Sequence, residues 1–190
     1  GGAFAGIQIN GANNNVITQT GDISATNGGE FGSKTGVFIF GTGNTINITG
    51  DMTSSGNNVP SFKITLGSSS NTINMTGNIT SSGRLSHGFI LDQSAFSNTI
   101  NMTGNITTTG ESFGFNIDSS DSNTINMTGN ITTTADGAYG ISLSGSDSND
   151  FTINGNIITS GTDGDSEPIL ISNSGSNTFT LSGAVHSLGG

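Results

Sequence analysis

The residues of this sequence most capable of metal chemistry are acidic side chains near the C-terminal end. Asp163, Asp165 and Glu167 alternate in GTDGDSEP, and Asp118 and Asp121 flank a predicted turn. Carboxylates supply the hard oxygen ligands that Ca²⁺ prefers. The segment lacks both the glycine of an EF-hand loop and the GGxGxD repeat of calcium-binding β-rolls. We interpret this segment as an acidic, solvated loop. The alternative is a calcium site formed by Asp163, Asp165 and Glu167, which is the one metal site that the sequence suggests.

The residues for general acid–base or nucleophilic catalysis are few and scattered. His87 and His186 are far apart in the sequence, and the only basic residues are Lys34, Lys63 and Arg84. No Gly-x-Ser-x-Gly elbow, phosphate-binding loop or zinc spacing occurs. The sequence therefore predicts no catalytic residue, no enzyme activity and no cofactor. A protein that binds or cleaves polysaccharides is kept as an alternative, which would require a groove with convergent carboxylates.

Composition narrows the possible partners. The 190 residues include 13 acidic and 3 basic ones, giving a net charge of −10. This charge argues against nucleic acid and against anionic membranes as partners. No apolar run approaches the ~18 residues of a membrane helix, so we expect no membrane insertion by this segment. The absence of cysteine agrees with a secreted or bacterial surface protein.

An internal repeat organises the whole chain. Successive copies of an Asn/Thr/Ile string close on a glycine, at intervals of 29, 27, 27, 25, 26 and 28 residues: Gly21, Gly50, Gly77, Gly104, Gly129, Gly155 and Gly183. A period of this length is typical of solenoid proteins. Seven units fill the sequence without a linker, which predicts one β-solenoid domain over residues 1–190.

Each unit divides into three short segments with a period of two. In the second unit these are GVFIF (36–40), NTINITG (44–50) and DMTS (51–54). The middle segment carries apolar residues two apart: Ile46/Ile48, Ile73/Met75, Ile100/Met102, Ile125/Met127, Phe151/Ile153 and Phe179/Leu181. Such alternation is typical of half-buried strands. The pattern predicts an all-β parallel β-helix (β-solenoid) of about seven coils of 25–29 residues, with three short strands per coil. Gln19 occupies an apolar position in the first unit, which predicts a frayed strand or a register bulge there.

Stacking such coils turns each repeated letter into a ladder of like side chains. One predicted ladder, turned inward at the start of the middle strand, consists of Asn44, Asn71, Asn98, Asn123, Asn149 and Asn177. Side-chain amides stacked in this way can satisfy one another's buried polar groups. A second polar ladder follows the closing glycine: Asp22, Asp51, Asn78, Asn105, Asn130 and Asn156.

The outward positions of the middle strand predict a face of Thr-Asn-Thr ranks. Its threonines are Thr45, Thr49, Thr72, Thr76, Thr99, Thr103, Thr124 and Thr128. Threonine favours strands, and uncharged stacks avoid like-charge repulsion, so the face is explained by strand formation and solubility. The alternative is a surface that orders water or binds ice, and we keep it as a second candidate function.

The repeat resembles a known family. The units HGFILDQSAFSNTINMTGNITTTG (87–110) and AYGISLSGSDSNDFTINGNIITSG (138–161) are similar to the repeats of autotransporter passenger domains and related large repetitive surface proteins of Gram-negative bacteria. Those repeats run Gly-Ile-x-Leu, then Asn-Thr-Ile-x-Asn-x-Gly, then a short Ile-Thr tail. The resemblance implies a right-handed β-helix, export to the cell surface, and a role in adhesion, aggregation, biofilm or a stalk.

The terminal segments complete the set of expectations. Neither AFAGIQING (3–11) nor AVHSLGG (184–190) resembles the caps that normally protect open strand edges. We therefore expect further β-helix coils at both ends, either from a longer chain or from identical subunits stacked head to tail into a fibre. The predicted function is a non-catalytic structural or adhesive segment at the bacterial cell surface, with host or matrix glycans as possible ligands.

Overall fold

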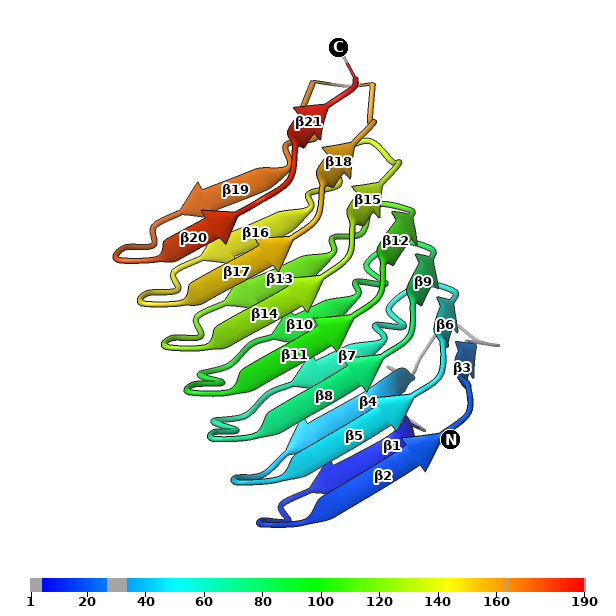
Figure 1. Ribbon diagram of the computed structural model, residues 1–190, viewed down its shortest axis with the longest axis vertical. Coiled ribbons are helices and arrows are strands. Elements are labelled where there is room, and N and C mark those ends of the chain that lie inside the picture. The colour runs from blue at the N-terminus through cyan, green and yellow to red at the C-terminus, as the bar shows by residue number, and fades with distance from the viewer. Residues whose placement is uncertain (1–4, 27–33, 163, 190) are drawn as a thin grey trace.

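A computed structural model describes residues 5–26, 34–162 and 164–189 of the chain. Within these residues every regular element is a strand, and the 21 strands form three parallel sheets of seven strands each. Figure 1 shows the three sheets rising side by side along one axis, with the N-terminal coil at one end and the C-terminal coil at the other. This arrangement confirms the predicted β-solenoid.

The bounds of the strands follow the three segments of the repeat. The first sheet contains β1 (Ala5–Asn10), β4 (Thr35–Phe40), β7 (Phe62–Ile64), β10 (Phe89–Leu91), β13 (Phe115–Asp118), β16 (Ile141–Ser144) and β19 (Ile169–Ser172). The second contains β2 (Val16–Thr20), β5 (Thr45–Thr49), β8 (Thr72–Thr76), β11 (Thr99–Thr103), β14 (Thr124–Thr128), β17 (Asp150–Asn154) and β20 (Thr178–Leu181). The third contains β3 (Ile23–Thr26), β6 (Met52–Ser55), β9 (Ile79–Ser82), β12 (Ile106–Thr109), β15 (Ile131–Thr133), β18 (Ile157–Thr159) and β21 (Val185–Ser187).

Each coil contributes one strand to each sheet, and each strand pairs with its counterparts one coil away. The chain runs along the second sheet, turns into the third, and returns through the first while climbing the axis, which is the predicted right-handed winding (Figure 1). Because parallel strands cannot be joined by a tight hairpin, the other two sides of the coil serve as the crossover.

Pairing is in register, so the repeat places like residues on top of one another. In the second sheet Ile100 pairs with Ile73 on one side and with Ile125 on the other. The inward Ile, Met, Leu and Phe side chains of all coils join into one core cluster. Phe62, Phe89 and Phe115 stack within it with ring centroids 4.5 and 4.9 Å apart. The core is thus a continuous column that no single repeat could form.

The glycine that closes each middle strand is required by the close approach of neighbouring coils. Gly104 has a φ of 141°, and a Cβ added there would lie 2.0 Å from the carbonyl oxygen of Gly77. Gly129 and Gly155 meet the coil below in the same way, also at 2.0 Å. Only a residue without a side chain fits this corner, which explains why the string ends on glycine in the second to seventh units.

The first coil corrects one expectation. Residues Val16–Thr20 pair one to one with Thr45–Thr49, and Gln19 pairs with Ile48. The strand is therefore neither frayed nor bulged at Gln19. The Gln19 side chain is half-buried, and its Nε2 donates to the carbonyl oxygen of Thr20 at 3.2 Å. A polar residue is accommodated at this inward position because its amide finds a backbone acceptor on its own strand.

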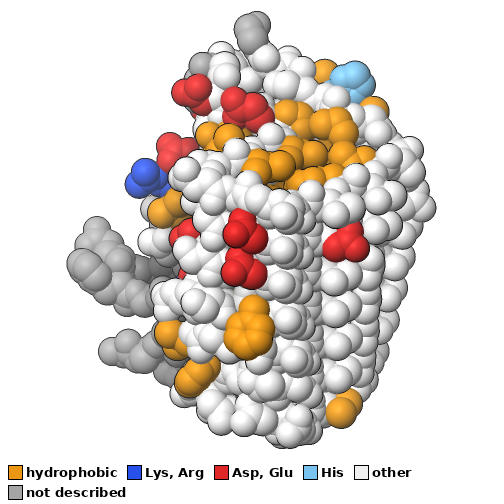
Figure 2. Space-filling model, turned by 90° about the vertical axis from the view of Figure 1, so that its left-hand side faces the viewer, with side chains coloured by type: hydrophobic (Ala, Val, Ile, Leu, Met, Phe, Trp, Pro, Cys, Tyr) orange, Lys and Arg blue, Asp and Glu red, His pale blue; other side chains and the backbone are white. Residues whose placement is uncertain are grey.

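The last coil leaves its apolar side chains uncovered. Ile171 and Val185 are 47% and 44% exposed, whereas Leu143 and Ile157, their partners one coil below, are fully buried. Figure 2 shows hydrophobic side chains gathered at the top of the molecule, and the face below them is mostly uncharged. Among the described strands, β19, β20 and β21 each pair on one side only.

Candidate functional site

The predicted inward ladder of Asn44, Asn71, Asn98, Asn123, Asn149 and Asn177, here called the inner asparagine ladder, lies at the turn into the second sheet. The backbone N–H and the Nδ2 group of each member both donate to the Oδ1 atom of the member one coil higher. For Asn71 and Asn98 these two distances are 3.1 and 2.9 Å. The members from Asn44 to Asn149 are buried, and Asn177 is half-buried.

The ladder has a seventh member that the sequence reasoning missed. Asn15 donates from its backbone N–H and its Nδ2 to Asn44 Oδ1, both at 2.9 Å. The signal was present, because Asn15 directly precedes the first middle strand, as Asn44 precedes the second. The ladder satisfies buried backbone and amide groups at this corner, and its chemistry is therefore that of a scaffold.

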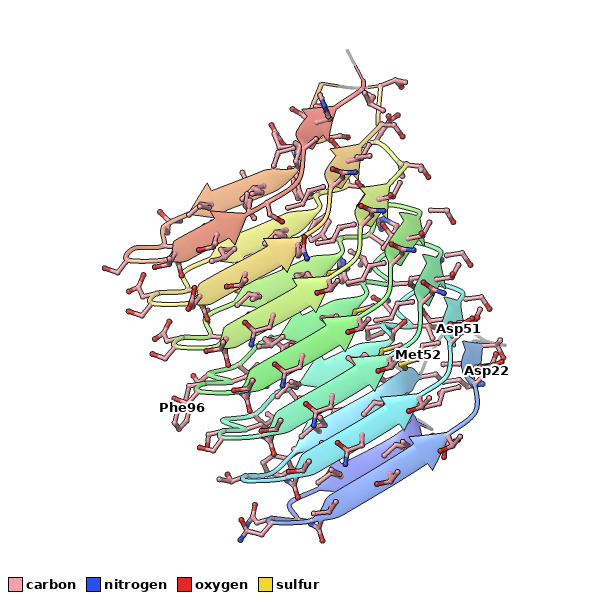
Figure 3. The ribbon with its side chains drawn as sticks, in the orientation of Figure 1. Asp22, Asp51, Met52 and Phe96 are labelled. Atoms are coloured by element: carbon pink, nitrogen blue, oxygen red, sulfur yellow. The ribbon has the colours of Figure 1, made fainter. Side chains whose placement is uncertain are left out.

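The second polar ladder has the opposite hydrogen-bond direction. The backbone N–H of each member donates to the side-chain oxygen of the member one coil lower, as Asp51 does to Asp22 at 2.8 Å. Figure 3 shows Asp22 and Asp51 on adjacent coils of the solenoid, directly before β3 and β6 respectively. The last step is from Ala184 to Asn156. These groups, exposed from Asp22 to Asn105 and half-buried at Asn130 and Asn156, link adjacent turns along the axis.

The outward face of the second sheet carries three ordered rows. The first threonine row is Thr45, Thr72, Thr99 and Thr124, and the second threonine row is Thr49, Thr76, Thr103 and Thr128. Between them lies the outer asparagine row of Asn47, Asn74, Asn101 and Asn126. The Nδ2 group of each of the last three donates to the Oδ1 of the Asn below, at 2.8, 2.9 and 2.9 Å. The row is therefore held in one rotamer along the axis.

Within the residues that the structure describes, the threonine hydroxyls of this face have no protein partner. In the described structure none of the eight Oγ1 atoms makes a hydrogen bond to the chain, and the second row is exposed while the first is half-buried. A shallow groove of about 480 Å³ runs between the outer asparagine row and the second threonine row. It crosses β8, β11, β14 and β17 and is lined by Asn, Thr and Met alone: Asn74, Met75, Thr76, Asn101, Met102, Thr103, Asn126, Met127, Thr128, Thr152 and Asn154.

A further hydroxyl row lies on the outward face of the third sheet, and the sequence reasoning did not identify it. Thr53, Thr80, Thr107 and Thr132 stack there in register. The repeated tail of the string, as in NIT, carried the signal. This row offers a comparison surface of the same chemistry.

His87 lies in a turn between the third and first sheets and is only 4% exposed. Its Nδ1 accepts a hydrogen bond from the backbone N–H of Phe113 at 2.8 Å, and its ring packs against the Phe113 ring with centroids 4.6 Å apart. Burial lowers the pKa of His87 to about 4, with a smaller contribution from the positive charge of Lys63. The imidazole is therefore neutral near pH 7 and fixed in the turn.

Two of the three basic side chains are engaged in ion pairs between adjacent coils. Lys63 Nζ lies 2.8 Å from Asp92 Oδ2, and Arg84 Nε lies 2.6 Å from Glu111 Oε2. Both members of the Arg84 pair are largely exposed, so this pair contributes little to stability.

The predicted calcium candidate is described only in part. Asp163 lies outside the described residues, while Asp165 and Glu167 are both exposed. Across residues 5–26, 34–162 and 164–189, no three His, Cys, Asp or Glu side chains gather as metal ligands would.

In the same described residues, no helix is long and apolar enough to cross a membrane.

Comparison of the chain with protein-family models, with curated proteins and with solved structures found no match. The β-solenoid is the part of the expected resemblance that the structure shows. The relation to autotransporter passengers and bacterial surface proteins has no support beyond the repeat motif.

Proposed function

We propose that this chain is a non-catalytic structural or adhesive segment of an extracellular protein on a bacterial cell surface, where it forms a rod by stacking coils. The observation that carries the proposal is the inner asparagine ladder, which repeats the same pair of hydrogen bonds through six successive steps, from Asn15 to Asn177.

The fold supports a role that depends on length and stiffness. Each coil contacts its neighbours through three strands and one shared core, so the rod lengthens by one coil spacing, ~4.8 Å, with every added repeat. A surface of uncharged Ser, Thr and Asn side chains keeps the rod soluble with few charges. Spacers, stalks and adhesive rods require these properties.

The partners we propose follow from the same geometry. A further coil, from a longer polypeptide or from an identical subunit, would cover Ile171 and Val185 and pair with the free edges of β19, β20 and β21. Host or matrix glycans are the proposed ligands of the lateral faces.

The test is labelling of intact cells of the organism that encodes the chain, combined with deletion of the gene. We expect an antibody against residues 34–162 to label unpermeabilised cells, and the deletion to reduce attachment or aggregation. Labelling that requires permeabilised cells would exclude the surface role. Release of sugars from a polysaccharide by the purified chain would show catalysis and so exclude the proposed non-catalytic role.

A further inference from the structure

We propose that the groove between the outer asparagine row and the second threonine row binds a single neutral polysaccharide chain lying along the solenoid axis. This inference rests on the adhesive part of the proposed function and gives it a ligand class and a site. Four features of the groove carry it: its direction, its fixed amides, its free hydroxyls and its lack of charge.

The direction of the groove suits a chain-like ligand. The lining residues come from three neighbouring columns of β8, β11 and β14, together with two residues of β17, so the groove runs across the strands and along the axis. Its repeat is the coil spacing of ~4.8 Å. A pyranose unit in an extended polysaccharide has about this length, so successive sugars would meet equivalent sets of side chains.

The amides on one wall are already ordered. Asn74, Asn101 and Asn126 each use one Nδ2 hydrogen in the bond to the coil below. Each therefore keeps a second N–H and a free oxygen lone pair for a ligand. Because the rotamers are fixed before binding, little side-chain entropy is lost when a ligand binds.

The opposite wall supplies hydroxyls without partners. Thr76, Thr103 and Thr128 are exposed, and their Oγ1 atoms make no hydrogen bond to the described chain. A hydroxyl can both donate and accept, as the hydroxyls of a sugar do. Amides on one side and hydroxyls on the other thus match a ligand that carries hydroxyl groups along both edges.

Charge selects among polysaccharides. The lining contains only Asn, Thr and Met, and the chain carries a net charge of −10. An anionic polysaccharide would be repelled, and no lysine or arginine in the lining would compensate it. The ligand we infer is therefore neutral.

The shape of the groove also favours a single polysaccharide chain over ice, because a flat ice lattice requires a flat protein face.

The test is binding of the purified chain to suspensions of cellulose, chitin and β-1,3-glucan, with alginate as the anionic comparison. We expect retention on at least one neutral polysaccharide and none on alginate. The double variant Thr103→Val/Thr128→Val removes two hydroxyls and keeps the β-branched shape. Two lost hydrogen bonds should weaken binding about tenfold or more.

The matched control is Thr53→Val/Thr80→Val, which removes two exposed hydroxyls from the third sheet. It should bind as the unmodified chain does. Equal weakening by both double variants, or retention on none of the three neutral polysaccharides, would overturn the proposal. Thermal hysteresis lost in Thr103→Val/Thr128→Val, without polysaccharide retention, would assign the face to ice instead. The cell-surface labelling above does not depend on this groove, so either proposal can fail alone.

Discussion

At the residue scale, asparagine has two different roles in this molecule, one in the buried corner of the coil and one on the outer face. Asn98 and Asn101 lie three residues apart on the same coil, yet Asn98 is buried at the corner and Asn101 is half-exposed on the outer face. Both donate an amide hydrogen to a neighbouring asparagine. Burial decides the difference, because an unsatisfied polar group costs free energy only where water cannot reach it.

Replacement of these two residues should separate the two roles. Asn98→Ala leaves the backbone N–H of Asn71 and one of its Nδ2 hydrogens without their acceptor in the interior. We expect it to lower the free energy of unfolding by about 2–4 kcal/mol, and Asn101→Ala by less than about 1 kcal/mol. Urea unfolding measures both. Similar losses for the two variants would contradict a structural role confined to the inner ladder.

His87 should make stability depend on pH. Burial holds its pKa at about 4 against an ordinary 6.5, so the unfolded chain takes up a proton first as the pH falls. The stabilisation is complete above pH 6.5 and is lost toward pH 4. Between pH 6.5 and about 5 we expect a loss of up to about 2 kcal/mol.

The control for this prediction is His87→Asn, whose amide oxygen can still accept from Phe113 but does not titrate. Unfolding of both proteins in urea across this pH range should show the slope only in the chain with His87. A slope of the same size in the Asn variant would assign the pH dependence to other groups.

At the element scale, the corner between the second and third sheets limits what the strands can be. Strand pairing brings each coil so close to the next that the closing glycine of one faces the carbonyl oxygen of another. The middle strand therefore ends where the glycine stands, and the third strand begins two residues later in every coil.

Two glycine substitutions test this limit. Gly104→Ala places a Cβ 2.0 Å from Gly77 O, whereas Gly67→Ala, at a φ of 72°, meets nothing within 4 Å. We expect Gly67→Ala to cost about 1 kcal/mol for its backbone conformation. Gly104→Ala should cost more than about 3 kcal/mol or prevent folding, because neighbouring backbones must separate. Thermal unfolding compares them, and equal melting temperatures would refute the close-approach argument.

At the scale of the whole molecule, the stacked coils form a rod whose last coil exposes apolar side chains and unpaired strand edges. Phe179 lies on Phe151 with ring centroids 4.8 Å apart, and within the described residues nothing stacks on its other face. Because apolar surface and unpaired strand edges both favour association, the end of the rod is where self-association should occur.

We expect the purified chain to form end-to-end oligomers at high concentration and Ile171→Lys to stay monomeric, because a charge would then lie on the apolar end. Thr80→Lys, on the side of the rod, is the control and should associate like the unmodified chain. Analytical ultracentrifugation and electron microscopy measure the outcome. Discrete single rods of the unmodified chain would argue against assembly from identical subunits.

The sequence alone determined the architecture of this protein, because the fold repeats. A period of two within each segment and a period of 25–29 residues between glycines left few ways to bury Ile100, Met102 and their counterparts other than stacked coils. The inner ladder could be foreseen for the same reason, since in-register stacking places Asn98 on Asn71 whatever the details of the turns.

The tertiary structure decided what depends on the space between coils. It placed Gln19 in register, because a backbone carbonyl satisfies its amide. It buried His87 under Phe113, although both lie in turns that vary along the chain. It also formed the groove beside the outer asparagine row, which depends on the bonds that fix each amide. Periodicity specifies which residues stack, but only packing in three dimensions determines which of them remain accessible to a ligand.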